Sequence, residues 1–353
     1  MRSNDPAAPP RPLDSPPPGL SRPKRLLVGR MLAALKRRRR APLAAIRGER
    51  AERRDRREGR IPPPQPRRKD VRSVVCFLCG PGDLGGLLDS IEALRASDGD
   101  ATQVLVVDDT SVTAREALVR ERFPEVEVLR NRLRTGGPPH LWPLCQLGLH
   151  HALRHYSFEQ WVKMDADALV TATGFSEQTL ARLAAAPAAG MAGNTGTRCD
   201  GAPADYRYHA GVLRAEAHRS RTLTAAVERA RAAGWELGEN VHGGVFCVTR
   251  AACEAISRAG WLAWREPWHS LVSEDLAFSL FVRAEGFELL SIGDPNGIFA
   301  IANKHLPLPK EEIAGGPWVA THSVRVGLDG ESESDLRAFF RAHRSAWPSA
   351  PGQ

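Results

Sequence analysis

The sequence predicts an α/β fold in which helices flank a mainly parallel central sheet. Short apolar runs of strand length alternate along residues 71–164 with longer segments of helical periodicity. Several of these runs are apolar at nearly every position, which is typical of strands buried on both faces. With 353 residues, of which 42% are hydrophobic, the chain is long enough to bury such a sheet in one large domain or two ordinary ones.

The expected elements follow one another as strand, helix and strand. We expect strands at 71–78, 103–107, 126–129 and 160–164, and helices at 84–96, 114–123 and 140–156. Strands separated by helices pair in parallel, because the helix carries the chain back across the sheet. In such sheets ligands bind at the carboxyl ends of the strands, so functional residues are expected at that edge.

Residues 1–70 differ in composition from the rest of the chain. Residues 1–72 contain 22 Lys and Arg against 7 Asp and Glu, a net charge of +15, whereas residues 73–353 carry −7. The proline-rich segment has few apolar residues, which predicts disorder. Within it, residues 24–40 place apolar side chains at helical spacing before a basic run, which predicts a short amphipathic helix. Two interpretations stay open: residues 24–60 bind an anionic membrane surface, or they are a solvated tail.

The remaining composition bears on where the protein acts. The sequence has neither a run of about 18 apolar residues nor a secretory signal, so we expect a cytoplasmic protein, peripheral at the inner face of the membrane if its basic segment binds there. The six cysteines lack the spacing of a disulfide-stapled domain, which favours a reducing compartment. Cys76 and Cys79 have C-x-x-C spacing, but without a second such pair we expect buried thiols. Residues 328–353 are expected to be a tail with a short helix, packed on the core or joining subunits.

Acidic side chains follow two of the predicted strands directly. Asp108 and Asp109 come after the strand at 103–107, and Asp165 and Asp167 come after the strand at 160–164. Side chains alternate along extended backbone, so Asp165 and Asp167 point the same way and can converge on one hard cation. Mg²⁺ and Mn²⁺ prefer such oxygens and use their remaining positions for diphosphate oxygens. The alternative for each acidic pair is turn chemistry or solvation.

Three further motifs lie downstream in a fixed order. They are the glycine-containing strand Gly243-Gly244-Val245-Phe246-Cys247-Val248-Thr249-Arg250, the acidic motif Ser273-Glu274-Asp275, and His322 at the end of an apolar strand. Together with the two acidic pairs, this ordered set resembles the inverting GT-A glycosyltransferases, family 2-like, over about residues 72–325. The resemblance implies a GT-A nucleotide-diphospho-sugar transferase fold over residues 71–327. Asp109-Thr110-Ser111 departs from the D-G-S common in that family, and residues 131–137 depart from its arginine-asparagine segment.

The resemblance also implies a role for each motif. Asp108 is expected to contact the nucleobase with Asp109 beside it, and Asp165 and Asp167 to hold the metal and the diphosphate. His322 is expected to bind the metal or contact the diphosphate. These assignments imply metal-assisted, inverting transfer of a sugar from a nucleoside-diphosphate donor, with UDP favoured, to a hydroxyl group on a sugar, a lipid-linked acceptor or a cell-surface polysaccharide.

The acidic motif supplies the expected general base. Inverting transfer needs one carboxylate to take the proton of the acceptor hydroxyl, and we assign Asp275, with Glu274 the less favoured residue. Alternatively, Ser273, Glu274 and Asp275 only cap the following helix and complement its positive start. His322 has a structural alternative as well, as a hydrogen-bonded residue outside the site.

Two further groups have an expected contact with the substrates. His242 precedes two glycines that permit close approach of the backbone, so contact with the acceptor or the diphosphate is one interpretation. The tryptophans Trp261, Trp264 and Trp268 precede the acidic motif and could stack on an acceptor sugar, serve in packing or contact a membrane.

Other functions remain to be weighed against this one. A nucleotidyltransferase or a retaining transferase could use a similar sheet, and a catalytically inactive relative could act as a scaffold. A nucleic-acid-binding protein acting through the basic residues 24–72 is not expected, because it leaves the acidic pairs and the negative charge of the remainder unexplained.

Overall fold

A computed structural model describes residues 69–80, 84–109, 114–131, 135, 141–264 and 270–347. The expected disordered segment up to residue 68, including the predicted helix at 24–40, lies outside the described residues. Those that are described belong to a single compact unit.

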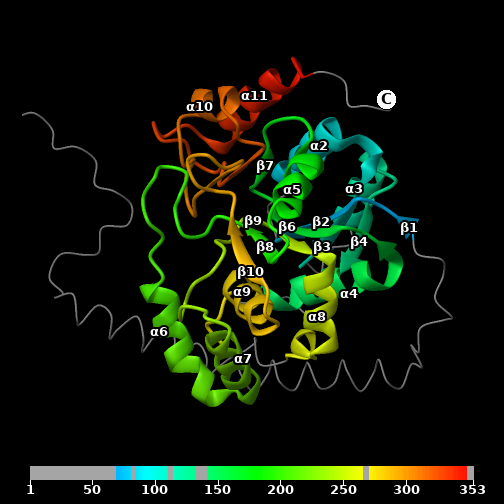
Figure 1. Cartoon of the computed structure of the whole chain (residues 1–353). Helices are drawn as coiled ribbons and strands as arrows, with labels where there is room; N and C mark the ends of the chain where they lie inside the picture. The colour runs from blue at the N-terminus through cyan, green and yellow to red at the C-terminus, as the bar shows by residue number, and fades with distance from the viewer. Residues whose placement is uncertain are drawn as a thin grey trace, which may run out of the picture. The chain divides into compact units, whose positions relative to one another are not determined.

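The centre of this unit is a seven-stranded sheet with the strand order β10-β8-β9-β6-β2-β3-β4 (Figure 1). Its strands are β2 (Ser73–Cys79), β3 (Thr102–Asp108), β4 (Glu127–Arg130), β6 (Gln160–Asp165), β8 (Ala189–Gly193), β9 (Val245–Thr249) and β10 (Glu288–Ser291). Neighbouring strands are parallel except at β9, which is antiparallel to both β6 and β8. The expected fold class, a mainly parallel sheet flanked by helices, is therefore confirmed.

Two smaller sheets accompany the central one. Strand β12 (Ala320–His322) pairs in parallel with β11 (Phe299–Ile301) and antiparallel with β7 (Leu169–Val170). Strand β1 (Lys69–Asp70) pairs in parallel with β5 (Tyr156–Ser157). Because β7 follows β6 after a short turn, its pairing with β12 brings the end of β12 next to the carboxyl end of β6.

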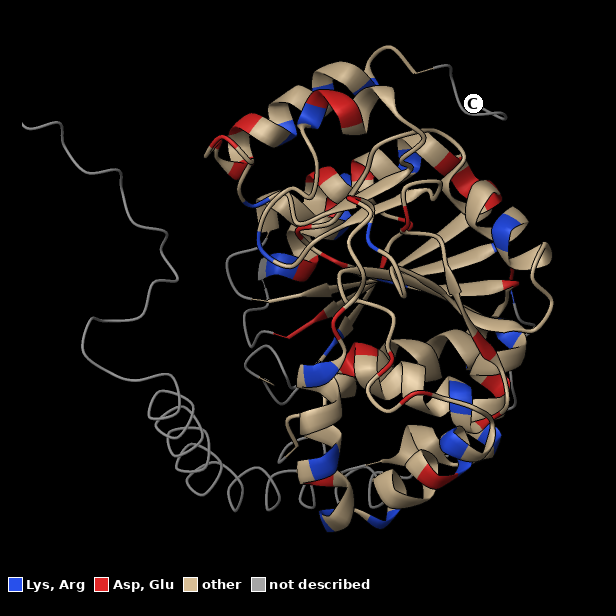
Figure 2. Ribbon diagram, turned by 60° about the vertical axis from the view of Figure 1, so that its left-hand side comes forward, with Lys and Arg blue, Asp and Glu red and all other residues tan. Residues whose placement is uncertain are grey.

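Helices cover both faces of the central sheet. They are α2 (Leu84–Asp98), α3 (Ala114–Arg122), α4 (Trp142–His155), α5 (Phe175–Ala184), α6 (Arg207–Glu216), α7 (Arg221–Ala232), α8 (Arg250–Arg258), α9 (Glu274–Ala284), α10 (Lys310–Gly315) and α11 (Glu333–Arg344). Short 3₁₀ turns are present at Gly99–Ala101, Ala217–Arg219 and Trp261–Ala263. In Figure 2 the charged residues lie mostly on helices and loops, whereas the strands of the central sheet are largely uncharged.

The alternation of side chains along β2 divides the interior into two apolar cores. Val74 and Cys76 point into a core that includes residues of α4, α7 and α9. Val75 and Phe77 point into a second core, on the other face, that includes residues of α2 and the small sheet β11-β12-β7. All six cysteines are buried and free, as expected for Cys76 and Cys79.

No helix in the part of the chain that the structure describes combines the length and the apolar composition that a membrane span requires.

Candidate functional site

The two acidic pairs lie at the same edge of the central sheet, as the sequence predicts. Strand β6 ends at Asp165 and strand β3 ends at Asp108, and both strands run parallel to β2 between them. Neighbouring strands are about 4.8 Å apart, so strands β6 and β3 lie roughly 10 Å from each other. The pairs therefore form two neighbouring groups rather than one cluster.

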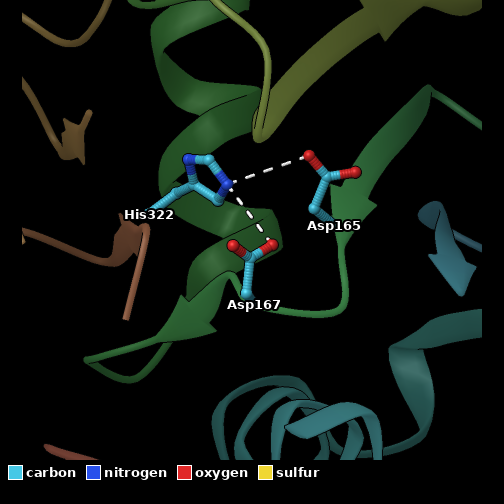
Figure 3. A group of neighbouring side chains, drawn as sticks. All are labelled: Asp165, Asp167 and His322. Atoms are coloured by element: carbon cyan, nitrogen blue, oxygen red, sulfur yellow. Dashed lines mark ion pairs between the residues drawn. The ribbon is translucent and has the colours of Figure 1, made fainter. Parts of the chain in front are cut away.

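Asp165 and Asp167 meet His322 in a metal group, by which we mean these three residues (Figure 3). One ligand atom from each residue lies within 4.8 Å of the other two. The Nε2 atom of His322 is 3.4 Å from Oδ1 of Asp167 and 3.8 Å from Oδ2 of Asp165. Residues far apart in the sequence are thus brought to one point by the pairing of β7 with β12.

The imidazole of His322 is held in a defined tautomer. Its Nδ1 atom lies 2.7 Å from the carbonyl oxygen of Ala302. A carbonyl oxygen only accepts hydrogen bonds, so Nδ1 carries a proton and donates it there. The Nε2 atom points at the two carboxylates, where it pairs with Asp167 when it carries a proton and is available to a cation when it does not.

Two side chains outside the metal group also hold Asp167. Its Oδ2 atom accepts hydrogen bonds from Ser323 Oγ at 2.8 Å and from Arg325 Nε at 2.7 Å. Burial acts to raise the pKa of Asp167, but the hydrogen bond and charge of His322, followed by Arg325 and Ser323, outweigh it and hold the pKa far below its usual range. The carboxylate is therefore ionised, as a metal ligand must be.

Two consecutive glycines lie between the metal group and the acidic motif. The backbone of Gly244 has a φ of +100°, and a Cβ atom there would be 2.4 Å from Nδ1 of His322. Its carbonyl oxygen accepts a hydrogen bond from Asp165 N at 2.9 Å. Gly243 N donates to Oδ2 of Asp275 at 3.0 Å. Asp275 thus contacts Gly243, and the metal group contacts the next residue, Gly244. Because consecutive Cα atoms are about 3.8 Å apart, the two contacts lie close together.

Asp275 is buried at the start of α9. Its Oδ1 atom accepts hydrogen bonds from Leu276 N at 2.8 Å and from the hydroxyl of Ser273. These contacts with the first turn of the helix are those that the capping interpretation predicts. The contact with Gly243 reaches beyond the helix, so the same carboxylate also borders the metal group.

The residue that sequence reasoning missed is Lys163. Its side chain is 0% exposed, and its Nζ atom lies 2.8 Å from Oδ1 of Asp165 and 3.0 Å from Oε1 of Glu274. Lys163 thus joins the metal group to the acidic motif by two ion pairs. The sequence does hold a signal, because a lysine inside the apolar strand Val162-Lys163-Met164 lies two residues before Asp165 and therefore on the same face.

Glu274 is the buried partner of Lys163 in one of these ion pairs. It is 5% exposed, and burial raises its pKa, with the nearby carboxylates of Asp275 and Asp165 acting in the same direction and Lys163 acting against them. Both carboxylates lie beside Gly243, but that of Glu274 is paired with Lys163, whereas that of Asp275 accepts a hydrogen bond from Gly243 N.

The second acidic pair has a different environment. Both oxygens of Asp109 accept hydrogen bonds from Thr135, from its backbone N at 2.9 and 3.0 Å and its hydroxyl at 2.7 Å, and Asn131 Nδ2 adds another at 2.8 Å. Asp109 therefore anchors Asn131 and Thr135. Asp108 is 1% exposed, with Oδ1 3.8 Å from Nη1 of Arg115. Contact of either residue with a nucleoside stays a prediction.

The remaining sequence candidates divide into two cases. His242 lies near Asp275; burial lowers its pKa, and the charge of that carboxylate acts in the opposite direction. Trp261 and Trp264 are in the core, where Trp261 stacks on Phe281 at 5.4 Å and Trp264 packs edge-on against the same ring. A sugar-stacking role for these two tryptophans is therefore wrong, and Trp268 lies outside the described residues.

No protein-family model and no curated protein sequence matches this chain. The structure is similar to the mannosyltransferase PcManGT from Pyrobaculum calidifontis in complex with GDP-Man and Mn²⁺, with 18% identity and a TM-score of 0.38 over 75% of this chain and 66% of the other. The galactosyltransferase LgtC, in complex with donor and acceptor sugar analogs, has 12% identity and a TM-score of 0.42 over 79% of this chain and 98% of its own. The bifunctional glycosyltransferase WbbM in its apo form has 10% identity and a TM-score of 0.43 over 81% of this chain and 51% of its own.

These three proteins are glycosyltransferases. The chain spans just under two thirds of PcManGT and about half of WbbM. With every TM-score below 0.5, the similarity assigns neither a sugar, nor an acceptor, nor a stereochemical course.

Proposed function

We propose that this chain is a metal-assisted glycosyltransferase that moves a sugar from a nucleoside-diphosphate donor to a hydroxyl acceptor. The observation that carries the proposal is the metal group, with its ligand atoms within 4.8 Å of one another at the carboxyl edge of a mainly parallel sheet. Two carboxylates and one imidazole leave positions open on a divalent cation for diphosphate oxygens. A nucleoside-diphosphate sugar carries such oxygens beside the bond that transfer breaks.

The side chains of the metal group suit Mn²⁺ or Mg²⁺. Asp167 is ionised, and His322 presents Nε2 because Nδ1 donates to Ala302. An imidazole nitrogen among the ligands favours Mn²⁺, since Mg²⁺ is a harder cation that prefers oxygen. A cation bound there would neutralise the negative charge that accumulates on the departing diphosphate.

The residues beside the glycine pair supply the proton transfer of an inverting reaction. The acceptor oxygen bonds to the anomeric carbon as the bond from that carbon to the diphosphate breaks, and the hydroxyl proton passes to Asp275. Asp275 suits this role better than Glu274, because Lys163 neutralises Glu274 within the protein. Asp108, at the end of β3, contacts the nucleoside. The favoured donor is a sugar linked to uridine diphosphate.

The acceptor is a hydroxyl group on a sugar, a lipid-linked molecule or a surface polymer. Binding of residues 24–60 to an anionic membrane would place the protein beside a lipid-linked acceptor. This part of the proposal rests on the composition of the basic segment alone.

Thermal unfolding with a panel of UDP- and GDP-sugars, each with and without Mn²⁺, tests the metal-donor site. A ligand that binds only the folded chain stabilises it by about 2.7 kcal/mol at a hundred times its Kd. We expect one sugar donor to raise the unfolding midpoint in the presence of Mn²⁺. His322→Ala should remove the effect, and His305→Ala, a change at an exposed histidine, should keep it. Equal stabilisation of both variants would contradict the proposed metal group.

The products test the reaction type. Asp275→Asn is expected to lower kcat by about 10²–10⁴-fold, the usual contribution of a general base, while sugar-donor binding persists. NMR of the product should show an inverted anomeric configuration and a released nucleoside diphosphate. A retained configuration would identify a retaining transferase, and free pyrophosphate a nucleotidyltransferase; either result would overturn inverting transfer.

A further inference from the structure

The C-terminal helix α11 reaches the turn that carries two residues of the metal group. Arg337 of α11 is 6% exposed, and its Nη2 atom donates to the carbonyl oxygen of Ala166 at 2.9 Å. Ala166 separates Asp165 from Asp167 in the chain. The guanidinium of Arg337 is thus one hydrogen bond from the peptide that links the two carboxylates.

The guanidinium is fixed on all of its nitrogens. Nη1 donates to Oδ2 of Asp89 at 3.1 Å and to Oγ of Ser90 at 3.2 Å, and Nε donates to Oε1 of Glu333 at 2.8 Å. A planar group with its donors engaged in several directions has little freedom to turn. The Nη2 atom that reaches Ala166 therefore has a defined position.

Helix α2 leaves room for this side chain at one residue. A Cβ atom at Gly86 would lie 2.7 Å from Nη2 of Arg337 and 3.1 Å from the carbonyl oxygen of Ala166. Both atoms of the hydrogen bond would be crowded by any larger residue. The absence of a side chain at Gly86 thus leaves the space that the guanidinium of Arg337 occupies beside the first turn of α2.

Every backbone carbonyl of the turn has a partner. Asp165 O accepts from Ala168 N at 3.0 Å, Asp167 O accepts from Val324 N at 3.0 Å, and Ala168 O accepts from the hydroxyl of Ser90 at 2.6 Å. The remaining carbonyl, Ala166 O at the middle of the turn, accepts from Arg337 Nη2 at 2.9 Å and from the hydroxyl of Ser90 at the longer distance of 3.3 Å. Since each peptide orientation is set, the two carboxylates are held facing His322.

From this geometry we infer that Arg337 is a positioning residue for the metal group, acting through the Ala166 peptide. The inference rests on the proposed function, because it concerns how firmly that group binds its cation. Losing a residue that orients metal ligands commonly weakens metal affinity by about 10–100-fold, and we expect that loss for Arg337→Met.

A second arginine of the same helix provides the matched control. Arg344 is also buried, and its Nη2 atom donates to Oδ1 of Asp89 at 2.8 Å, but the structure places it on Asp89 and Glu92 rather than on the turn. Arg337→Met and Arg344→Met remove the same charge from the same buried carboxylate. Both should lower the unfolding midpoint, whereas only Arg337→Met should weaken Mn²⁺ binding. The full chain is titrated with Mn²⁺, and the free ion is read by electron paramagnetic resonance.

Gly86→Ala gives a second route to the same displacement, because it keeps the arginine and moves its guanidinium. We expect it too to weaken Mn²⁺ binding. Unchanged Mn²⁺ affinity in whichever of Arg337→Met and Gly86→Ala folds would overturn the role of Arg337 and leave the metal group standing. Absence of Mn²⁺ binding by the wild-type chain would instead overturn the metal group, and the inference with it.

Discussion

Gly244, the residue before β9, sets how closely the backbone approaches His322. In Gly244→Ala the new Cβ would lie 2.4 Å from Nδ1 of His322, on backbone with a positive φ. We expect the imidazole to be displaced and Mn²⁺ binding to fall by tenfold or more, about the loss seen when a ligand loses its orientation. The strain of the positive φ should cost about 1–2 kcal/mol in addition.

Gly260→Ala separates strain from displacement. Gly260 also has a positive φ, of 83°, but a Cβ atom there would meet no atom within 4 Å. This variant should lose stability through strain while its Mn²⁺ affinity, measured by the same titration, stays at the wild-type value. Equal Mn²⁺ affinity in both variants would show that contact with His322 does not require glycine.

Lys163 is predicted to be needed for the stability of the site. In Lys163→Met the buried Glu274 loses its counter-ion, and breaking a buried ion pair costs about 3–5 kcal/mol of unfolding free energy. Adding Glu274→Gln to that variant should recover about 0.5–3 kcal/mol, since the uncompensated charge is removed. Urea unfolding of the two single variants and the double variant measures this coupling, and strictly additive losses would contradict it.

At the scale of residues, the sequence was informative where strands end and uninformative where side chains meet. Asp165 and Asp167 were placed together on the assumption of extended backbone, whereas β6 ends at Asp165 and a turn brings both carboxylates to His322. The contact of Lys163 with Glu274 joins residues more than a hundred positions apart, so spacing alone does not indicate it. The same limit applies to the hydrogen bonds of Asp109 with Thr135.

At the scale of elements, the strands predicted at 71–78, 103–107, 126–129 and 160–164 agree with β2, β3, β4 and β6 to within two residues at each end. Continuous apolar runs marked them. The strand expected before His322 is present as β12, whereas β7 and β11 were not separable from loops, because elements of two or three residues show no periodicity. The antiparallel direction of β9 also escaped prediction, since it depends on pairing with distant strands.

The contact between α11 and α2 predicts a particular response to acid. Burial acts to raise the pKa of Asp89, but hydrogen bonds and charges from Arg344 and Arg337 outweigh it, so the pKa is lowered. A lowered pKa in the folded state adds stability that is full above the unfolded value of about 3.9 and is lost as the pH falls towards the folded value. Asp89→Asn removes that contribution.

Near neutral pH the free energy of unfolding of Asp89→Asn should therefore be about 3–5 kcal/mol lower than that of the wild type, because two buried arginines lose their partner. As the pH falls below about 4 towards the lowered folded pKa, this difference should narrow, because Asp89 takes up a proton in the unfolded wild-type chain before it does so in the folded chain. Thermal unfolding followed by circular dichroism across the acid range measures this difference. A gap that stays constant down to the lowest pH would show that Asp89 is not ionised in the folded chain.

At the scale of the whole molecule, charge is divided between two parts of the chain. Residues 1–72 carry +15 and residues 73–353 carry −7, whereas the buried apolar residues of the described part run from Val74 to Phe340. Binding to an anionic surface is therefore expected to reside in the basic segment, and folding and sugar-donor binding in the remainder. Each basic residue near an anionic membrane contributes on the order of 1 kcal/mol.

Removing residues 1–68 separates the two functions. The full chain should bind vesicles that contain phosphatidylserine more tightly than phosphatidylcholine vesicles, and rising salt should release it, because exposed charges are screened. The shortened chain should lose vesicle binding. Its unfolding midpoint should change by no more than about 2 °C, which corresponds to less than about 1 kcal/mol, because folding is expected to reside in the remainder of the chain. Co-sedimentation with vesicles and competition by duplex DNA measure both partners. Vesicle binding that survives the removal would place the contact in the folded part, and a preference for DNA would favour binding of nucleic acid by the basic segment.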